Sequence, residues 1–317
     1  MKKIVLHIIV ICFFYPINVT AAIDSSFVET PITLKTATGD IFGTITTPKN
    51  FTRIPVALII AGSGPTDRNG NNNFMKNDGL KQLAYALSAE NIASLRFDKR
   101  GIGESAKAAP KEEDLRFDDY VNDVKEWIEV LKKDKRFNSV IVIGHSEGSL
   151  IGMIAAKNAD KYISIAGAGE TADLILRKQL VTLPEELRDQ SFSILDSLKK
   201  GQLYQEVNPQ LNMVFRKSVQ PYMISWFKYD PQILIKELKI PVLIIQGTAD
   251  LQVKLEDANL LAKANPAAKL SIIEGMNHVL KIVGDDSKLN KKSYNDPTLQ
   301  IAPEMVKSIV DFINQKK

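Results

Sequence analysis

Residues 139–148 read SVIVIGHSEG, an apolar run followed directly by the pattern G-x-S-x-G. The next eight residues, SLIGMIAA, are small and apolar and favour a helix. A strand, a sharp turn and a helix in this order are the context in which a serine projects from the end of a sheet. We predict that Ser146 occupies a strained turn, where Gly144 and Gly148 avoid Cβ atoms that would collide.

Other apolar runs alternate with helical patterns on both sides of this segment. Residues 32–47 alternate loosely around Thr38-Gly39-Asp40, which predicts an antiparallel hairpin at the sheet edge. An amphipathic helix is expected over 117–132, and a helix over 301–315 closes the chain. The order predicts an α/β protein with a mostly parallel, doubly wound sheet. Buried-type strands are expected over 54–61, 92–97, 162–166, 241–245 and 269–273.

Residues 168–239 interrupt this alternation, because they contain no convincing strand pattern. A helix is expected over 184–200, and a second helical stretch over 211–228 that Pro221 must start, kink or split. We expect this stretch to be a helical cap inserted into a core of residues 23–167 and 240–317. The alternative is a helical subdomain that does not contact substrate.

The first 22 residues have the pattern of a secretory signal peptide. Lys2 and Lys3 precede an apolar run over 4–15, and small residues end at Ala21 and Ala22. The run is too short to span a bilayer, so cleavage near Ala21 or Ala22 would leave a secreted or periplasmic protein without a stable membrane span. An uncleaved anchor is the alternative. The chain's one cysteine, Cys12, would leave with this segment, so no disulfide is expected.

The charge pattern disfavours some partners. The chain has 41 Lys and Arg against 37 Asp and Glu, a formal net charge of +4, and the charges are interspersed. Without a basic stripe, nucleic acid is not expected as a partner. No dinucleotide fingerprint, phosphate-binding loop or metal-ligand cluster is recognisable, so neither a cofactor nor a metal is expected. The oligomeric state is left open.

A serine hydroxyl needs a base that removes its proton and an acid that orients the base. The chain has three histidines. His7 lies in the predicted signal peptide, and His145 is expected to point into the structure. His278 is left as the predicted general base, on a loop after the 269–273 strand.

The orienting acid should follow a strand between Ser146 and His278. Asp250 directly follows the 241–245 strand in the sequence QGTAD, and we predict that it is the third member of the triad. Asp257 and Glu170 are the alternatives. The order serine, aspartate, histidine along the chain is that of an α/β-hydrolase.

The oxyanion of a tetrahedral intermediate requires two aimed N–H donors. One is expected from the backbone of Glu147, at the start of the helix after the nucleophile. The second is expected from the loop GSGP after the 54–61 strand, and we predict the Ser63 backbone, with Gly62 and Gly64 beside it. A plain glycine-rich turn is the alternative. Four charged residues near these loops are expected to pin them by ion pairing: Asp67, Arg68, Asp98 and Arg100. A side chain of Arg68 that faces the substrate is the alternative.

These motifs together resemble the EstD-like carboxylesterases, within the esterase and serine-aminopeptidase-like branch of the α/β-hydrolase superfamily. The segments that carry the resemblance are GSGPTDRNG (62–70), FDKRGIGES (97–105), GHSEG (144–148), QGTAD (246–250) and Asn277-His278. The resemblance implies the α/β-hydrolase fold and cofactor-free hydrolysis of esters with short to medium acyl chains. The chain departs from the pattern of this family at one position, since many relatives carry histidine before the glycine of the oxyanion loop, where this chain has Ala61.

The expected function is therefore an exported serine hydrolase that acts on a small-molecule carboxylic ester through an acyl-enzyme. The same triad serves peptidases, amidases and thioesterases, and an aminopeptidase would need acidic groups near its substrate, for which Glu185 and Glu186 are available. A binding protein without catalytic activity is a third alternative.

Overall fold

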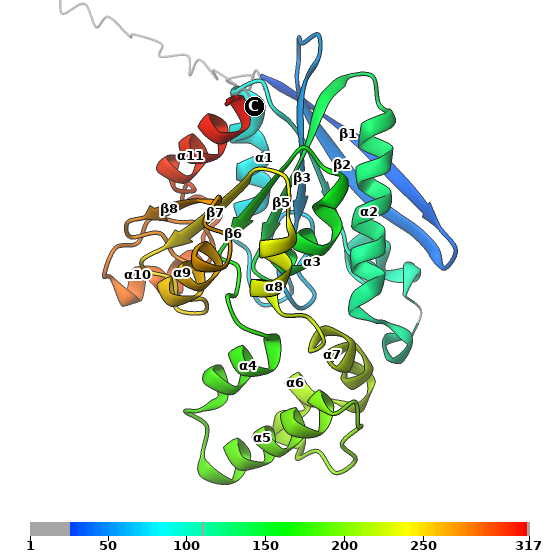
Figure 1. The fold of residues 1–317 in the computed structure, drawn as a ribbon, viewed down its shortest axis with the longest axis vertical. Coiled ribbons are helices and arrows are strands. Elements are labelled where there is room, and N and C mark those ends of the chain that lie inside the picture. The colour runs from blue at the N-terminus through cyan, green and yellow to red at the C-terminus, as the bar shows by residue number, and fades with distance from the viewer. Residues whose placement is uncertain (1–25, 110, 316–317) are drawn as a thin grey trace, which may run out of the picture.

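The computed structural model describes residues 26–109 and 111–315, so the predicted signal peptide lies outside the described residues. Within them, eight strands form one sheet in the order β1-β2-β4-β3-β5-β6-β7-β8 (Figure 1). The strands are β1 (Phe27–Thr36), β2 (Gly39–Pro48), β3 (Ile54–Ile60), β4 (Ala93–Phe97), β5 (Phe137–His145), β6 (Lys161–Ile165), β7 (Val242–Gly247) and β8 (Lys269–Ile273).

The sheet is parallel from β4 through β8, and its first two strands form an antiparallel edge. β1 pairs with β2 from Phe27↔Pro48 to Thr36↔Gly39, and β2 pairs antiparallel with β4. β3 lies between β4 and β5 and is parallel to both. The predicted fold class, a mostly parallel sheet with antiparallel edge strands, is confirmed.

Helices cover both faces of this sheet. α1 (Gly79–Ala89) and α11 (Pro303–Asn314) pack on one face, and α2 (Phe117–Lys133), α3 (Glu147–Ala155) and α9 (Leu255–Ala264) pack on the other (Figure 1). β5 serves both layers, because Val140 and Val142 point to the α2 side while Ile141 and Ile143 point to the α1 side. This explains why residues 140–143 of β5 are apolar at consecutive positions.

Residues 168–239 contain helices and no strand in the structure. We call them the helical segment. Residues Ile194, Leu198, Phe215 and Met223 are buried in a cluster that is separate from the two clusters flanking the sheet. The predicted 211–228 helix is divided as Pro221 required, since a new helix starts one residue before it. The helices are α4 (Ala172–Leu180), α5 (Glu185–Lys199), α6 (Asn212–Phe215), α7 (Gln220–Trp226) and α8 (Pro231–Glu237).

An aromatic contact joins the helical segment to α2. The Phe117 ring lies against Tyr222, Trp226 and Tyr229, with ring centroids 6.0, 6.1 and 5.4 Å away. The Phe117 N–H also donates to the Ser225 hydroxyl at 2.8 Å. Because α7 is held in this way, the helical segment lies at the carboxyl edge of the sheet (Figure 1).

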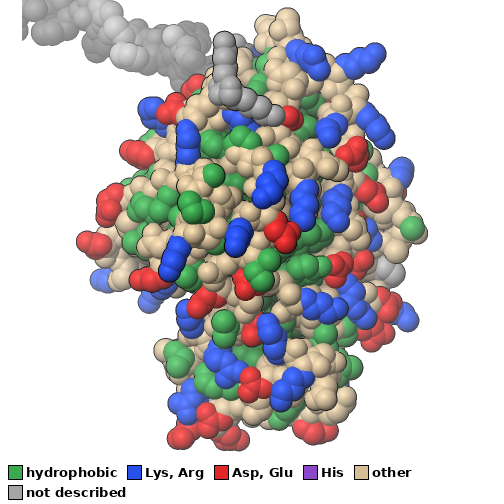
Figure 2. Space-filling model, viewed as in Figure 1, with side chains coloured by type: hydrophobic (Ala, Val, Ile, Leu, Met, Phe, Trp, Pro, Cys, Tyr) green, Lys and Arg blue, Asp and Glu red, His purple; other side chains and the backbone are tan. Residues whose placement is uncertain are grey.

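The surface of the described chain carries mixed charge. Basic and acidic side chains are interspersed over the face shown in Figure 2. No helix within residues 26–109 and 111–315 has both the length and the apolar character needed to cross a bilayer.

Candidate active site

The predicted site residues lie on loops that leave the carboxyl ends of parallel strands. Ser63 follows β3, Ser146 follows β5, Asp250 follows β7 and His278 follows β8. Since parallel strands end at the same edge of a sheet, these four loops meet there. This is where open α/β sheets bind their ligands.

Ser146 occupies the strained turn that the sequence predicted. Its backbone has φ 54° and ψ −120°, and its N–H donates to the Ile165 carbonyl at 2.9 Å. A Cβ at Gly144 would lie 2.2 Å from the Gly148 carbonyl oxygen, and a Cβ at Gly148 would lie 2.4 Å from that of Ile60. Real Cβ atoms do not come this close to another heavy atom, so Gly144 lets β5 approach the start of α3 and Gly148 lets α3 approach the end of β3.

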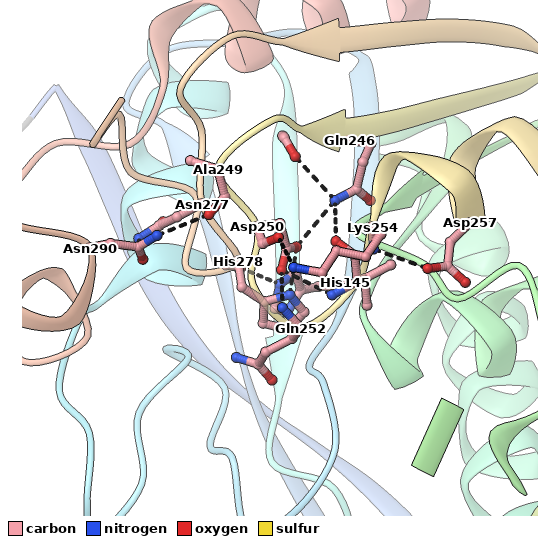
Figure 3. Close-up of polar contacts among 12 residues, drawn as sticks. His145, Gln246, Ala249, Asp250, Gln252, Lys254, Asp257, Asn277, His278 and Asn290 are labelled. Carbon is pink, nitrogen blue, oxygen red and sulfur yellow. Dashed lines mark hydrogen bonds and ion pairs between the residues drawn. The ribbon is translucent and has the colours of Figure 1, made fainter. Parts of the chain in front are cut away.

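Asp250 and His278 form the pair that the sequence analysis expected. The His278 Nδ1–H donates to Asp250 Oδ2 at 2.8 Å, and Gln246 Nε2 donates to the same oxygen at 3.2 Å (Figure 3). The other oxygen accepts the N–H groups of Gln252 and Val253 at 2.8 and 3.0 Å. Burial opposes ionisation of Asp250, but His278 and these N–H donors outweigh it and hold the pKa of Asp250 below its usual value.

The two alternative acids are engaged elsewhere. Asp257 accepts the backbone N–H of Lys254 at 3.0 Å, which shapes the start of α9 (Figure 3). It also accepts the backbone N–H of Gly169 at 2.9 Å. Glu170 forms an ion pair with Lys178. Among the described residues, neither carboxylate has a hydrogen bond to His278.

A short helix, α10 (Ser287–Ser293), connects the loops that carry Asp250 and His278. Asn290 donates to the Ala249 carbonyl at 2.9 Å, and its side-chain oxygen accepts from Asn277 at 3.0 Å (Figure 3). These bonds brace the residues next to each member of the pair.

Ser146 and His278 line one cavity of about 250 Å³, which we call the His278 cavity. Thr66, Asn72 and Asn77 line it too. The structure brings the two side chains to the same space, but it has no hydrogen bond between the Ser146 hydroxyl and the His278 ring. Catalytic hydrogen bonds are often long without substrate and tighten when it binds.

A second cavity, of about 110 Å³, meets the first at Ser146 and Ser63. We call it the Ile175 cavity. Its apolar lining combines the core with the helical segment: Leu150, Ile175, Leu176, Trp226 and Val253.

The loop after β3 passes close to Ser146, as the oxyanion prediction requires. A Cβ at Gly62 would lie 3.1 Å from Ser146 Cβ, and Ser63 lines both cavities. The backbone N–H groups of Ser63 and Glu147 have no acceptor among the described residues. Their role as oxyanion donors stays a prediction.

Of the four charged residues near these loops, Arg68, Asp98 and Arg100 form ion pairs, whereas Asp67 accepts backbone N–H groups. Arg68 binds Asp98 at 2.7 Å and also contacts Glu104, and Arg100 donates to Asp123 at 2.7 Å. Asp67 accepts the N–H groups of Asn69 and Asn71 at 2.8 and 2.9 Å, which closes the loop after β3. These contacts agree with the expected pinning of loops.

His145 lies closer to the site than the sequence suggested. Its ring was expected to point away, yet it lines the His278 cavity and its centroid is 4.8 Å from that of His278. Its Nε2–H donates to the His278 backbone carbonyl at 2.8 Å (Figure 3). The cause is the crossing of the His278 loop over the end of β5, a contact between residues distant in sequence. Burial and the neighbouring His278 lower the pKa of His145 to about 3.

This lowered pKa predicts an acid-dependent loss of stability. Between pH 3 and pH 6.5, the ordinary pKa of histidine, His145 is protonated in the unfolded chain but neutral in the folded chain. The contribution of His145 to the free energy of unfolding is therefore complete above pH 6.5 and is lost as the pH falls toward 3. We expect the urea midpoint of the wild type to fall more between about pH 7.5 and about pH 4 than that of His145→Gln. Equal falls in the two proteins would contradict the assignment.

Two polar residues of the site region escaped the sequence analysis. Gln246 donates to Asp250, and Lys99 is 1% exposed and donates to the Gly62 carbonyl at 2.6 Å. The one signal in the sequence was their position, since Gln246 is the second-last residue of β7 and Lys99 stands two residues after β4. Within residues 26–109 and 111–315, no three His, Cys, Asp or Glu side chains are placed to hold a metal ion.

Comparisons with known sequences agree with the motifs. The family model for serine aminopeptidase, S33, matches residues 77–181. Esterase EstD of Thermotoga maritima is 28% identical over 264 residues, which are 80% of this chain and 60% of that protein. The chain thus spans about 60% of the length of this curated relative.

Solved structures show the same fold. Est1E of Butyrivibrio proteoclasticus, with ferulic acid bound, has a TM-score of 0.60 and 19% identity over 90% of this chain and 100% of that one. The α/β-hydrolase GrgF of Penicillium sp. sh18 has a TM-score of 0.60 and 15% identity, over 90% and 97%. The esterase Pf2001 of Pyrococcus furiosus has a TM-score of 0.53 and 17% identity, over 92% of this chain and 93% of that one. The resemblance to α/β-hydrolases is confirmed, and the fold is theirs.

Proposed function

We propose that this chain, an α/β-hydrolase by its fold, is an exported serine hydrolase that cleaves carboxylic esters with short to medium acyl chains. One observation carries the proposal: a strained serine shares a cavity with a histidine that is bonded at 2.8 Å to a buried carboxylate of lowered pKa. The esterases among its relatives support an ester as substrate. Export rests on the pattern of residues 1–22.

In this mechanism Ser146 Oγ attacks the ester carbonyl carbon and its proton passes to His278 Nε2. The carbonyl oxygen becomes an oxyanion facing the N–H groups of Ser63 and Glu147. The C–O bond to the alcohol then breaks, and the alcohol takes the proton from His278. Asp250 holds the Nδ1–H and stabilises the imidazolium. Water repeats the sequence on the acyl-enzyme and releases the acid.

The two cavities orient the substrate. His278 must protonate the leaving alcohol, and it lines the His278 cavity but not the Ile175 cavity. The alcohol therefore lies in the first and the acyl chain in the second. At about 110 Å³ the Ile175 cavity is well below the size of a drug-binding pocket, which favours short acyl chains. The helical segment then acts as a cap, because α4 supplies Ile175 and Leu176.

The aminopeptidase alternative has less support from the site. Glu185 and Glu186 are exposed on α5 and line neither cavity. Glu170 lines the Ile175 cavity, but Lys178 already neutralises it. No acidic group at the cavities is left unpaired among the described residues to bind a free amino terminus.

A panel of p-nitrophenyl esters from acetyl to dodecanoyl, with an aminoacyl p-nitroanilide and an acyl thioester, tests the proposal. We expect the highest kcat/KM for short to medium esters. Faster turnover of the anilide or thioester would replace the ester assignment, and no turnover of any substrate would favour a binding protein.

The variant Ile175→Trp sharpens this test. The larger ring should fill the acyl site, so kcat/KM for a hexanoyl ester should fall by about 10-fold or more relative to an acetyl ester, given about 0.8 kcal/mol per buried methylene. Ile233→Trp, on an exposed position of α8, is the matched control. An unchanged chain-length profile in Ile175→Trp would place the acyl chain elsewhere.

A further inference from the structure

A lysine is buried behind the predicted oxyanion loop. Lys99 lies just after β4 and is 1% exposed. Its ammonium donates to the Gly62 carbonyl at 2.6 Å and to Glu147 Oε2 at 3.0 Å, and it lies 4.9 Å from the centre of the Tyr120 ring. Two of the three N–H groups of the ammonium thus donate to oxygen atoms of the protein, and the face of an aromatic ring lies beside the charge.

The chain of contacts continues into the helical segment. Glu147 has a nearly buried side chain, and its second oxygen accepts from the Tyr222 hydroxyl at 2.7 Å. Burial and the charge of Glu147 raise the pKa of Tyr222 well above its usual value, so this hydroxyl stays a donor. The Tyr120 ring packs edge-on against Tyr222, with centroids 5.7 Å apart. Tyr222 belongs to α7, so the contact spans the boundary between helical segment and core.

The Gly62 carbonyl and the Ser63 N–H are parts of one planar peptide. In a trans peptide the two groups point in opposite directions. A donor that fixes the carbonyl therefore also fixes the direction of the N–H. Glycine at 62 would otherwise make this peptide easier to rotate, because its ψ angle is less restricted than that of other residues. Rotation would leave a buried ammonium without one of its acceptors, which is unfavourable.

We propose that Lys99, Glu147 and Tyr222 are positioning residues that hold the Ser63 N–H in the direction of Ser146. This inference rests on the proposed function, since it concerns the oxyanion hole of that reaction. The ammonium also polarises the Gly62–Ser63 amide and makes its N–H a stronger donor. Glu147 has two roles in this arrangement. Its backbone N–H is the second oxyanion donor, and its side chain binds Lys99 and Tyr222. The seating of α7 is thereby coupled to the geometry of the oxyanion hole.

The test is Lys99→Met, which keeps the length of the side chain and removes its donors. Loss of one aligned oxyanion donor typically lowers kcat by about 100-fold or more, and we expect about 100-fold here with KM within about 3-fold. A trifluoromethyl ketone, which forms a tetrahedral adduct with the serine, should lose affinity by a similar factor. Lys157→Met is the matched control, because Lys157 is exposed and its ion pair with Glu237 lies at the surface.

A merely structural ion pair would give a different result. The double variant Lys99→Met with Glu147→Gln restores charge balance but leaves the Gly62 carbonyl without its donor. We expect it to stay as slow as Lys99→Met, within about 3-fold. Recovery of the wild-type kcat in the double variant would overturn the inference. Rates are taken per active site, titrated with a fluorophosphonate, so a smaller folded fraction does not imitate the effect.

Tyr222→Phe decides the matter if the lysine variants do not fold. It removes one hydroxyl and keeps the ring, and we expect kcat to fall by about 3- to 10-fold with KM unchanged. A wild-type kcat in Lys99→Met would contradict this inference and leave the proposed function intact. If only Tyr222→Phe folds, a wild-type kcat in that variant would do the same. Wild-type protein without esterase activity would instead sink the proposed function.

Discussion

Ser146→Ala is expected to lower ester turnover by about 10⁴- to 10⁶-fold, the range found when the nucleophile of such a triad is removed. The physical reason is that no acyl-enzyme can form without the hydroxyl. The backbone should tolerate the change, because alanine, like serine, carries a Cβ and so meets the same strain at φ 54°. The Ser146 hydroxyl also has no hydrogen-bond partner among the described residues that the change would remove.

Steady-state hydrolysis of p-nitrophenyl acetate measures the loss, and the urea midpoint reports the fold. Intact mass after fluorophosphonate treatment should show one adduct on the wild type and none on the variant. Ser139→Ala, at the opposite end of the same strand, is the matched control and should keep both activity and labelling. Turnover or labelling that survives in Ser146→Ala would remove the proposed nucleophile.

Asp250→Asn is expected to lower kcat by about 10³- to 10⁴-fold with little change in KM. The lowered pKa of Asp250 keeps its carboxylate ionised at neutral pH, where it accepts the Nδ1–H of His278. Asparagine can still accept the N–H groups of Gln252 and Val253 through its oxygen. Its amide then faces the imidazole with a donor, which favours the wrong tautomer and leaves the imidazolium unstabilised.

Asp257→Asn separates this role from a structural one. Asp257 is also buried and also accepts two backbone N–H groups, yet it has no hydrogen bond to His278. We expect its kcat within about 3-fold of the wild type, because the change affects the start of α9 and the N–H of Gly169 but leaves the bond between Asp250 and His278 in place. A larger loss in Asp257→Asn than in Asp250→Asn would exchange the two assignments.

Much of the fold was predictable from local patterns. The runs around 54–61, 92–97 and 269–273 became β3, β4 and β8 with small shifts at their ends. Pro221 lies in the first turn of α7, where its missing N–H costs no helical hydrogen bond. The Ser146 turn was predictable as well, because Gly144 and Gly148 are neighbours of the residue they serve.

Residues of the candidate site were predictable only where the chemistry of a serine nucleophile left few residues of the required type in the chain. With three histidines in the chain, elimination reached His278, and its bond to Asp250 is present. The contact of His145 with the His278 loop was not foreseen. Its two residues lie 133 positions apart, so no periodicity records it.

By itself the sequence determined the strand-turn-helix at Ser146, the alternation of strands and helices, and the break in that alternation at the helical segment. These depend on the conformations of adjacent residues and on the spacing of apolar side chains. The tertiary structure alone decided that Lys99, Glu147 and Tyr222 meet behind the Gly62–Ser63 peptide. Lys99 and Tyr222 are 48 and 75 positions from Glu147, and only the crossover of β3 between β4 and β5 and the docking of α7 bring them together. A buried charge needs a partner, but nothing in a linear chain says which one will reach it.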